Sequence, residues 1–91
     1  MSETIVLAPK LDLSAASELM TILRAQDAAE VEIDMSEVKH LGALCLQVLL
    51  AAAKTSRTEN RTITITNTSD RVIDQMRVMG MTPETIAKGY E

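Results

Sequence analysis

The segment His40–Lys54, "HLGALCLQVLLAAAK", is the longest apolar stretch of the chain. Between Leu41 and Ala53 its only polar side chain is that of Gln47. This run of 13 residues is shorter than the ~20 residues that a membrane-spanning helix needs. We therefore predict a helix packed within a folded protein, and no direct insertion into a membrane.

On a helical wheel this segment carries two apolar stripes rather than one. The first contains Gly42, Leu46, Leu49, Leu50 and Ala53, and the second contains Leu41, Leu44, Cys45, Val48 and Ala52. One stripe is expected to pack on a sheet. The second stripe either packs against neighbouring helices of the same chain or contacts another molecule. Burying a Leu or Val side chain contributes roughly 1.5–3 kcal/mol, so an exposed second stripe would be either a liability or a binding surface.

The remaining sequence alternates between strand and helix patterns. Strands are predicted within residues 4–10, 31–38 and 61–67, and helices within 11–26, 68–81 and 83–88. Ser14 and Ser69 are predicted as N-caps, and Gly80 as a C-cap. This order predicts parallel strands joined by right-handed crossovers. Because two strands alternate polar and apolar residues, we expect one α/β domain over 1–91, with helices packed mainly on one face of a small sheet.

Composition and charge exclude several classes of function. The net charge is −4 and the pI is about 4.9, whereas a nucleic-acid-binding surface is basic. Phe and Trp are absent and there is one Tyr, so the chain lacks the several aromatic side chains on which successive bases stack. A single cysteine allows no internal disulfide, and the first residues carry no signal-peptide pattern, so we expect a cytoplasmic protein.

The polar residues indicate neither catalysis nor a cofactor. One His and one Cys, without a Gly-rich phosphate loop, provide no nucleophile–base pair, so we expect no enzyme, no metal site and no cofactor. Ser36 is interpreted as a turn residue, with a phosphoacceptor as the alternative. Cys45 lies near the start of a predicted helix, where its pKa would be lowered, and is a weak redox candidate. Arg57 and Arg61 are interpreted as solvated.

Four segments in order resemble a STAS domain, the fold of bacterial anti-sigma factor antagonists. They are "KLDLSAASEL" (10–19), "VEIDMSEVKHLGALCLQVLLAAAK" (31–54), "RTITITN" (61–67) and "VIDQMRVMGM" (72–81). The resemblance covers about residues 4–88. It implies a small mixed or mainly parallel sheet with helices packed on one face.

The resemblance also assigns a position to the phosphorylation switch of the family. Alignment through "LQVLLAAAK" places the phosphorylatable Ser or Thr of the family at Leu44, the preceding Asp at Gly42 and the following Gly at Cys45. Leucine has no hydroxyl, so this position cannot be phosphorylated. An apolar residue there implies a lasting contact with a partner, for which the expected residues are Leu41, Ala43, Leu44, Cys45 and Val48.

The resemblance implies a non-enzymatic adaptor in bacterial signalling. The expected partner is a GHKL-type kinase, either an anti-sigma kinase or a chemotaxis histidine kinase of the CheA type. Three alternatives stay open. They are a regulatory STAS subunit of an ABC-type lipid transporter, an anti-sigma factor antagonist phosphorylated at Ser36 or another hydroxyl, and a homodimer formed through the second stripe.

Overall fold

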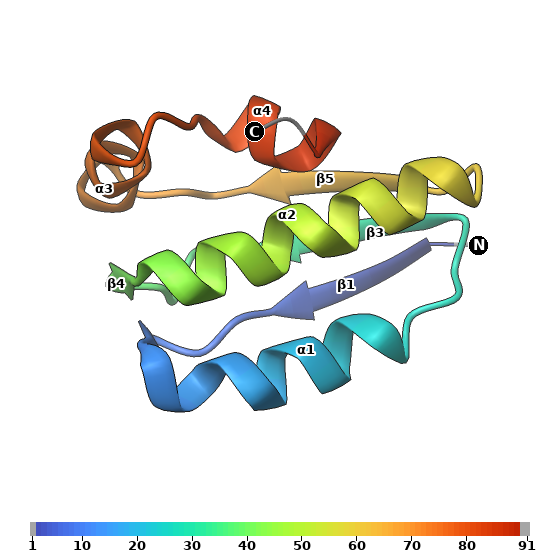
Figure 1. Cartoon of the computed structure of the whole chain (residues 1–91), viewed down its shortest axis with the longest axis horizontal. Helices are drawn as coiled ribbons and strands as arrows, with labels where there is room; N and C mark the ends of the chain where they lie inside the picture. The colour runs from blue at the N-terminus through green and yellow to red at the C-terminus, as the bar shows by residue number, and fades with distance from the viewer. Residues whose placement is uncertain (1, 90–91) are drawn as a thin grey trace.

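The computed structural model describes residues 2–89, which form a three-stranded parallel sheet covered by helices (Figure 1). Strand β3 (Glu30–Asp34) lies in the centre, between β1 (Ser2–Val6) and β5 (Thr62–Thr66). In this register Ile5, Ile33 and Ile65 are aligned across the sheet. The three isoleucines point to the same face because side chains alternate along each strand.

The two faces of the sheet differ in polarity. On the helical face Val31 is buried and Ile33 is fully inaccessible to solvent. The opposite face carries polar residues of β3 and the threonines of β5, where the Thr66 hydroxyl donates to the Glu32 carboxylate at 2.7 Å. In Figure 1 α2 (Ala43–Thr58) passes in front of the sheet, with α1 (Ala16–Arg24) drawn below β1 and α4 (Pro83–Lys88) above β5. The predicted fold class is thus confirmed.

Helix α2 occupies the middle of this layer, with α1 on one side and α4 on the other (Figure 1). Leu46, Leu49 and Leu50 are buried in the core. Val48 is only 6% exposed, because the flank of α2 that carries it faces α1. Helix α4 approaches the other flank closely, since Gly89 lies against Lys54. The neighbouring helices therefore cover much of the second stripe.

The ends of the shorter elements test the predicted caps. The Ser69 hydroxyl accepts from the backbone N–H of Val72, which confirms Ser69 as the N-cap of α3 (Asp70–Val78). Gly80 follows α3 with a φ of +79°, a conformation that glycine adopts readily. Helix α4 spans Pro83–Lys88, as predicted. Ser14 is not an N-cap, because the Asp12 carboxylate takes that role for the 3-10 turn η1 (Leu13–Ala15).

The apolar segment that begins at His40 is not helical throughout. His40–Leu41 forms the short strand β4, which pairs in parallel with β2 (Lys10–Leu11). Helix α2 then begins at Ala43 and continues to Thr58, beyond the predicted end. Within residues 2–89, no helix is both long and apolar enough to cross a bilayer.

Candidate docking site at the start of α2

Backbone hydrogen bonds between β2 and β4 fix where α2 begins. The Pro9 carbonyl accepts from the N–H groups of Lys39 and His40, at 2.8 and 3.2 Å, and the Leu11 carbonyl accepts from Gly42 N–H at 2.8 Å. A Cβ atom on Gly42 would lie 3.1 Å from that same carbonyl oxygen. Glycine therefore permits the close approach of the two segments, and α2 starts from a rigid point.

A side chain from α3 holds the same segment from the other side. The Gln75 Oε1 atom accepts from the backbone N–H of Leu41 at 2.8 Å. Its Nε2 atom lies 3.3 Å from Nδ1 of His40. One carboxamide thus binds both residues of β4, and α3 is fixed to the strand that leads into α2.

The turn η1 packs against the first turn of α2. The Cys45 thiol donates to the backbone carbonyl of Asp12 at 3.3 Å. The Asp12 carboxylate in turn accepts from the Ser14 hydroxyl at 2.7 Å and from the Ser14 N–H at 3.1 Å. The Ser14 hydroxyl is the main cause of the lowered pKa of Asp12. These bonds order η1 and hold Leu13 at the surface.

Leu13 and Leu44 are exposed apolar side chains at this end of the molecule. Leu13 is 77% exposed and Leu44 is 47% exposed. Ala43, at the first position of α2, is also exposed, and the first turn of α2 contains no acidic residue. We refer to Leu13, Ala43 and Leu44 as the docking patch. A surface of this kind is typical of a contact with another protein.

Three of the five residues predicted to contact a partner are buried, so the prediction that they lie at the surface is wrong. Leu41 and Val48 are 2% and 6% exposed, and Cys45 is fully buried. Leu41 belongs to β4, Cys45 is enclosed by η1, and Val48 lies on the flank that faces α1. The first turn of α2 therefore presents only Ala43 and Leu44 of the five predicted residues.

Leu13 is a candidate contact that the residue pattern did not predict, since it lies directly before Ser14, the predicted N-cap of the first helix. Its neighbours Leu11 and Ala16 are buried, whereas Asp12 and Ser14 form the capping bonds of η1. An apolar residue between two capping polar residues cannot also face the core. That local pattern, Asp-Leu-Ser directly before a helix, was the available signal.

The Cys45 thiol is a packing group. Burial raises its pKa, and the nearby Asp12 carboxylate raises it further. A thiol with a raised pKa is less ionised and therefore less reactive. The expectation that the helix start would lower this pKa, and so favour redox chemistry, is wrong.

Ser36 lies in the turn that follows β3. Its backbone N–H donates to Oδ1 of Asp34 at 2.8 Å, and Asn67 Nδ2 contacts the same oxygen at 3.3 Å. The Ser36 bond is the main cause of the lowered pKa of Asp34. The Asp34 carboxylate thus organises this turn, in which Ser36 is exposed, and the alternative role of Ser36 as a phosphoacceptor is not tested by its position.

The two arginines predicted to be solvated both make hydrogen bonds. Arg61 is half-buried, donates to the Gln26 carbonyl and pairs with Glu59. Arg57 donates to the carbonyl of Lys88 at 2.7 Å, which joins α2 to the end of α4. Within residues 2–89, no group of three or more His, Cys, Asp or Glu side chains could hold a metal ion.

The geometry defines a small α/β domain with a parallel sheet, a helical layer on one face and an apolar surface at the start of α2. Comparison with known families agrees, since residues 2–86 match the family described as "Mlab, STAS domain". The chain therefore belongs to the STAS domain family. STAS domains are generally regulatory domains that bind protein partners. No curated protein matches this chain.

Proposed function

We propose that this protein is a non-enzymatic adaptor in the bacterial cytoplasm that binds the ATP-binding domain of a GHKL-type kinase through the docking patch. The kinase is either an anti-sigma kinase or a chemotaxis histidine kinase of the CheA type. The observation that carries the proposal is the exposure of Leu44, 47%, in the first turn of α2. By resemblance, switching members of the family carry their phosphorylatable hydroxyl at this position.

The chemistry of Leu44 makes the contact permanent. Phosphorylation of a Ser or Thr adds about −1.5 to −2 charge, and the cost of desolvating that charge would oppose contact with an apolar partner surface. Leu44 accepts no phosphate and adds an apolar side chain to the same surface. Full burial of a leucine contributes roughly 1.5–3 kcal/mol, so Leu13 and Leu44 together can supply a substantial part of a binding energy.

A second candidate function uses the same surface. The matching family carries the description "Mlab, STAS domain". The resemblance to STAS domains also implies a second role, as a regulatory subunit of an ABC-type lipid transporter. In that case the docking patch would contact the transporter ATPase. The two candidates differ in the class of ATP-binding partner and agree on the residues.

Copurification from the native lysate distinguishes the two candidates. We expect wild-type protein to capture a histidine or anti-sigma kinase, and Leu44→Glu to capture none. With the purified partner, the Kd should rise by about tenfold or more, as for truncation of a central interface residue. Capture of an ABC-type ATPase would favour the second candidate. A partner bound equally by wild type and Leu44→Glu would refute the docking patch.

A matched control separates a local effect from a general loss of binding. Val78 is 88% exposed near the end of α3, so Val78→Glu adds the same charge at another apolar surface position. We expect Val78→Glu to bind like wild type.

Two further measurements test the remaining alternatives. Light scattering of the wild-type protein tests the homodimer, and intact mass after incubation with the kinase and ATP tests phosphorylation of Ser36. A phosphate adduct would replace the permanent contact with a phosphorylation switch.

A further inference from the structure

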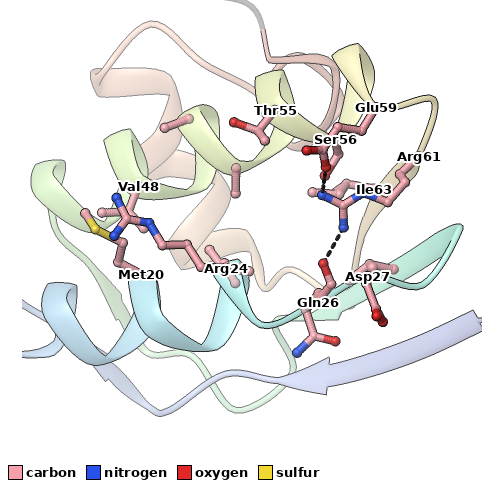
Figure 2. A pocket seen from close by; sticks show the side chains of 14 residues that line it. Met20, Arg24, Gln26, Asp27, Val48, Thr55, Ser56, Glu59, Arg61 and Ile63 are labelled. Atoms are coloured by element: carbon pink, nitrogen blue, oxygen red, sulfur yellow. Dashed lines mark hydrogen bonds and ion pairs between the residues drawn. The ribbon is translucent and has the colours of Figure 1, made fainter.

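A cavity of about 590 Å³ lies between α1 and the second half of α2, over β3 and β5 (Figure 2). Its apolar lining includes Leu23, Val31, Val48 and Ile63. Pockets that hold small molecules typically measure roughly 300–1,000 Å³ and are mostly apolar, with a few polar groups. This cavity is of that kind, and it shares no residue with the docking patch.

The charged groups around the cavity are distributed unevenly. The Arg61 guanidinium is engaged by the Gln26 carbonyl and by Glu59. Arg24 is exposed and makes no hydrogen bond or ion pair with any residue in 2–89. Figure 2 places Arg24 across the cavity from Arg61, and both acidic lining residues, Asp27 and Glu59, on the Arg61 side. The Arg24 side therefore offers an uncompensated positive charge.

A nearly buried hydroxyl in the lining also has no partner. Ser56 is 4% exposed, and its hydroxyl makes no hydrogen bond within the described part of the chain. By contrast, the hydroxyls of Thr21 and Thr58 donate to carbonyls of Ser17 and Thr55 in their own helices. The Ser56 hydroxyl lines the cavity and is therefore available to bond a molecule inside it.

We propose that this cavity is a binding site for a small amphipathic carboxylic acid. The hydrocarbon part packs on Val31, Val48 and Ile63, and the carboxylate pairs with the Arg24 guanidinium at the mouth. Charge-assisted bonds of this type are the strong ones, and arginine suits a planar carboxylate. The Ser56 hydroxyl bonds a polar substituent of the acid or a water that accompanies it.

Decanoate, added below its micelle concentration to methyl-labelled protein, tests the proposal. We expect saturable shifts of the methyl signals of Val31, Val48 and Ile63, and none at Val72 or Ile86, which are buried and do not line the cavity. Shifts confined to Leu13 and Leu44 would place the acid on the docking patch and overturn the proposal. Absence of any saturable shift would overturn it as well.

Two variants test the charge and the volume. Arg24→Gln should raise the Kd for decanoate by about tenfold, equivalent to ~1.4 kcal/mol, and leave the binding of decanol unchanged. Arg71→Gln, which removes an exposed arginine on α3 that does not line the cavity, is the matched control. Ala51→Phe fills the cavity from an exposed position and should abolish binding while the thermal unfolding transition stays cooperative. Decanoate binding that survives Arg24→Gln or Ala51→Phe unchanged contradicts the proposal.

Discussion

The Gln75 side chain accepts a hydrogen bond from the backbone N–H of Leu41 at 2.8 Å. This bond joins α3 to a strand residue that lies 34 positions earlier in the chain. Leu41 is buried and stands two residues before the first residue of α2. The position of the docking patch therefore depends on a carboxamide that lies in a different helix.

Removal of this carboxamide should destabilise the fold. Gln75→Leu leaves the N–H of Leu41 without its acceptor, and a buried unpaired donor costs about 1–3 kcal/mol. Urea unfolding followed by circular dichroism measures the change. Asp74→Asn, an exposed position on the same helix, should change the free energy of unfolding by less than about 0.5 kcal/mol. Equal effects of the two substitutions would contradict the role of Gln75.

Two glycines with positive φ should differ in their tolerance of alanine. Gly80 has a φ of +79° and nothing within 4 Å of an added Cβ, so Gly80→Ala should cost about 1–2 kcal/mol from backbone strain alone. Gly89 has a φ of +76°, and its Cβ would lie 2.9 Å from the Lys54 backbone nitrogen. Gly89→Ala should therefore lower the thermal midpoint by more than Gly80→Ala, and the reverse order would refute the packing of α4 on α2.

Burial of Cys45 should protect its thiol from alkylation. In native protein, iodoacetamide should react at least about a hundredfold more slowly than in urea, as measured by intact mass, because reaction requires unfolding. The raised folded pKa also gives a stability contribution that is complete below the unfolded pKa, about 8.5, and is lost as the pH rises through the folded value. Above about pH 8.5 the wild-type free energy of unfolding should thus fall more steeply than that of Cys45→Ala.

The lowered pKa of Asp34 makes an opposite prediction in acid. Its contribution is present above the unfolded pKa, about 3.9, and is lost as the pH falls through the lower folded value. Asp34→Asn should be less stable than wild type at neutral pH, and the difference should shrink as the pH falls below the unfolded pKa. Urea unfolding at several pH values measures the difference. A difference that does not change with pH would show that the carboxylate charge is irrelevant to the turn at Ser36.

Leu13 should contribute to binding without contributing to the fold. Since its side chain is 77% exposed, Leu13→Glu should change the free energy of unfolding by less than about 0.5 kcal/mol. Binding of the partner captured by the wild-type protein should nevertheless weaken, as for Leu44→Glu. Titration calorimetry with that partner measures the effect, and unchanged affinity would restrict the contact to α2.

Local sequence patterns predicted the elements because each pattern depends on neighbouring residues. The alternation of Val31 and Ile33 with acidic residues indicated a strand with one buried face, and the structure confirms it. The short final helix was predicted over 83–88, and the structure adds a capping box between Thr82 and Thr85 at its start. The Asp12 carboxylate accepts a hydrogen bond from the Ser14 N–H, a role that aspartate commonly has at a helix entry.

The exposure of the candidate site could not be predicted in the same way. Val48 and Leu44 belong to the same stripe, yet Val48 is covered by α1 and Leu44 extends past it. The distinction depends on how η1 and α1 lie along α2, which contacts distant in sequence determine. The hydrogen bonds of Leu41 with Gln75 and of Arg61 with Gln26 also join residues that are distant in sequence, so no local pattern predicts them.

Helix α2 is continuous over 16 residues, which corresponds to a rod of about 24 Å. One end carries the docking patch and the other borders the cavity, so the proposed protein partner and the proposed acid would contact different residues of the domain. Any influence of one occupant on the other has to pass through the body of the domain, and thermodynamic linkage makes it equal in both directions. An acid that raised the affinity of the protein for a partner would itself bind with higher affinity to the complex than to the free protein.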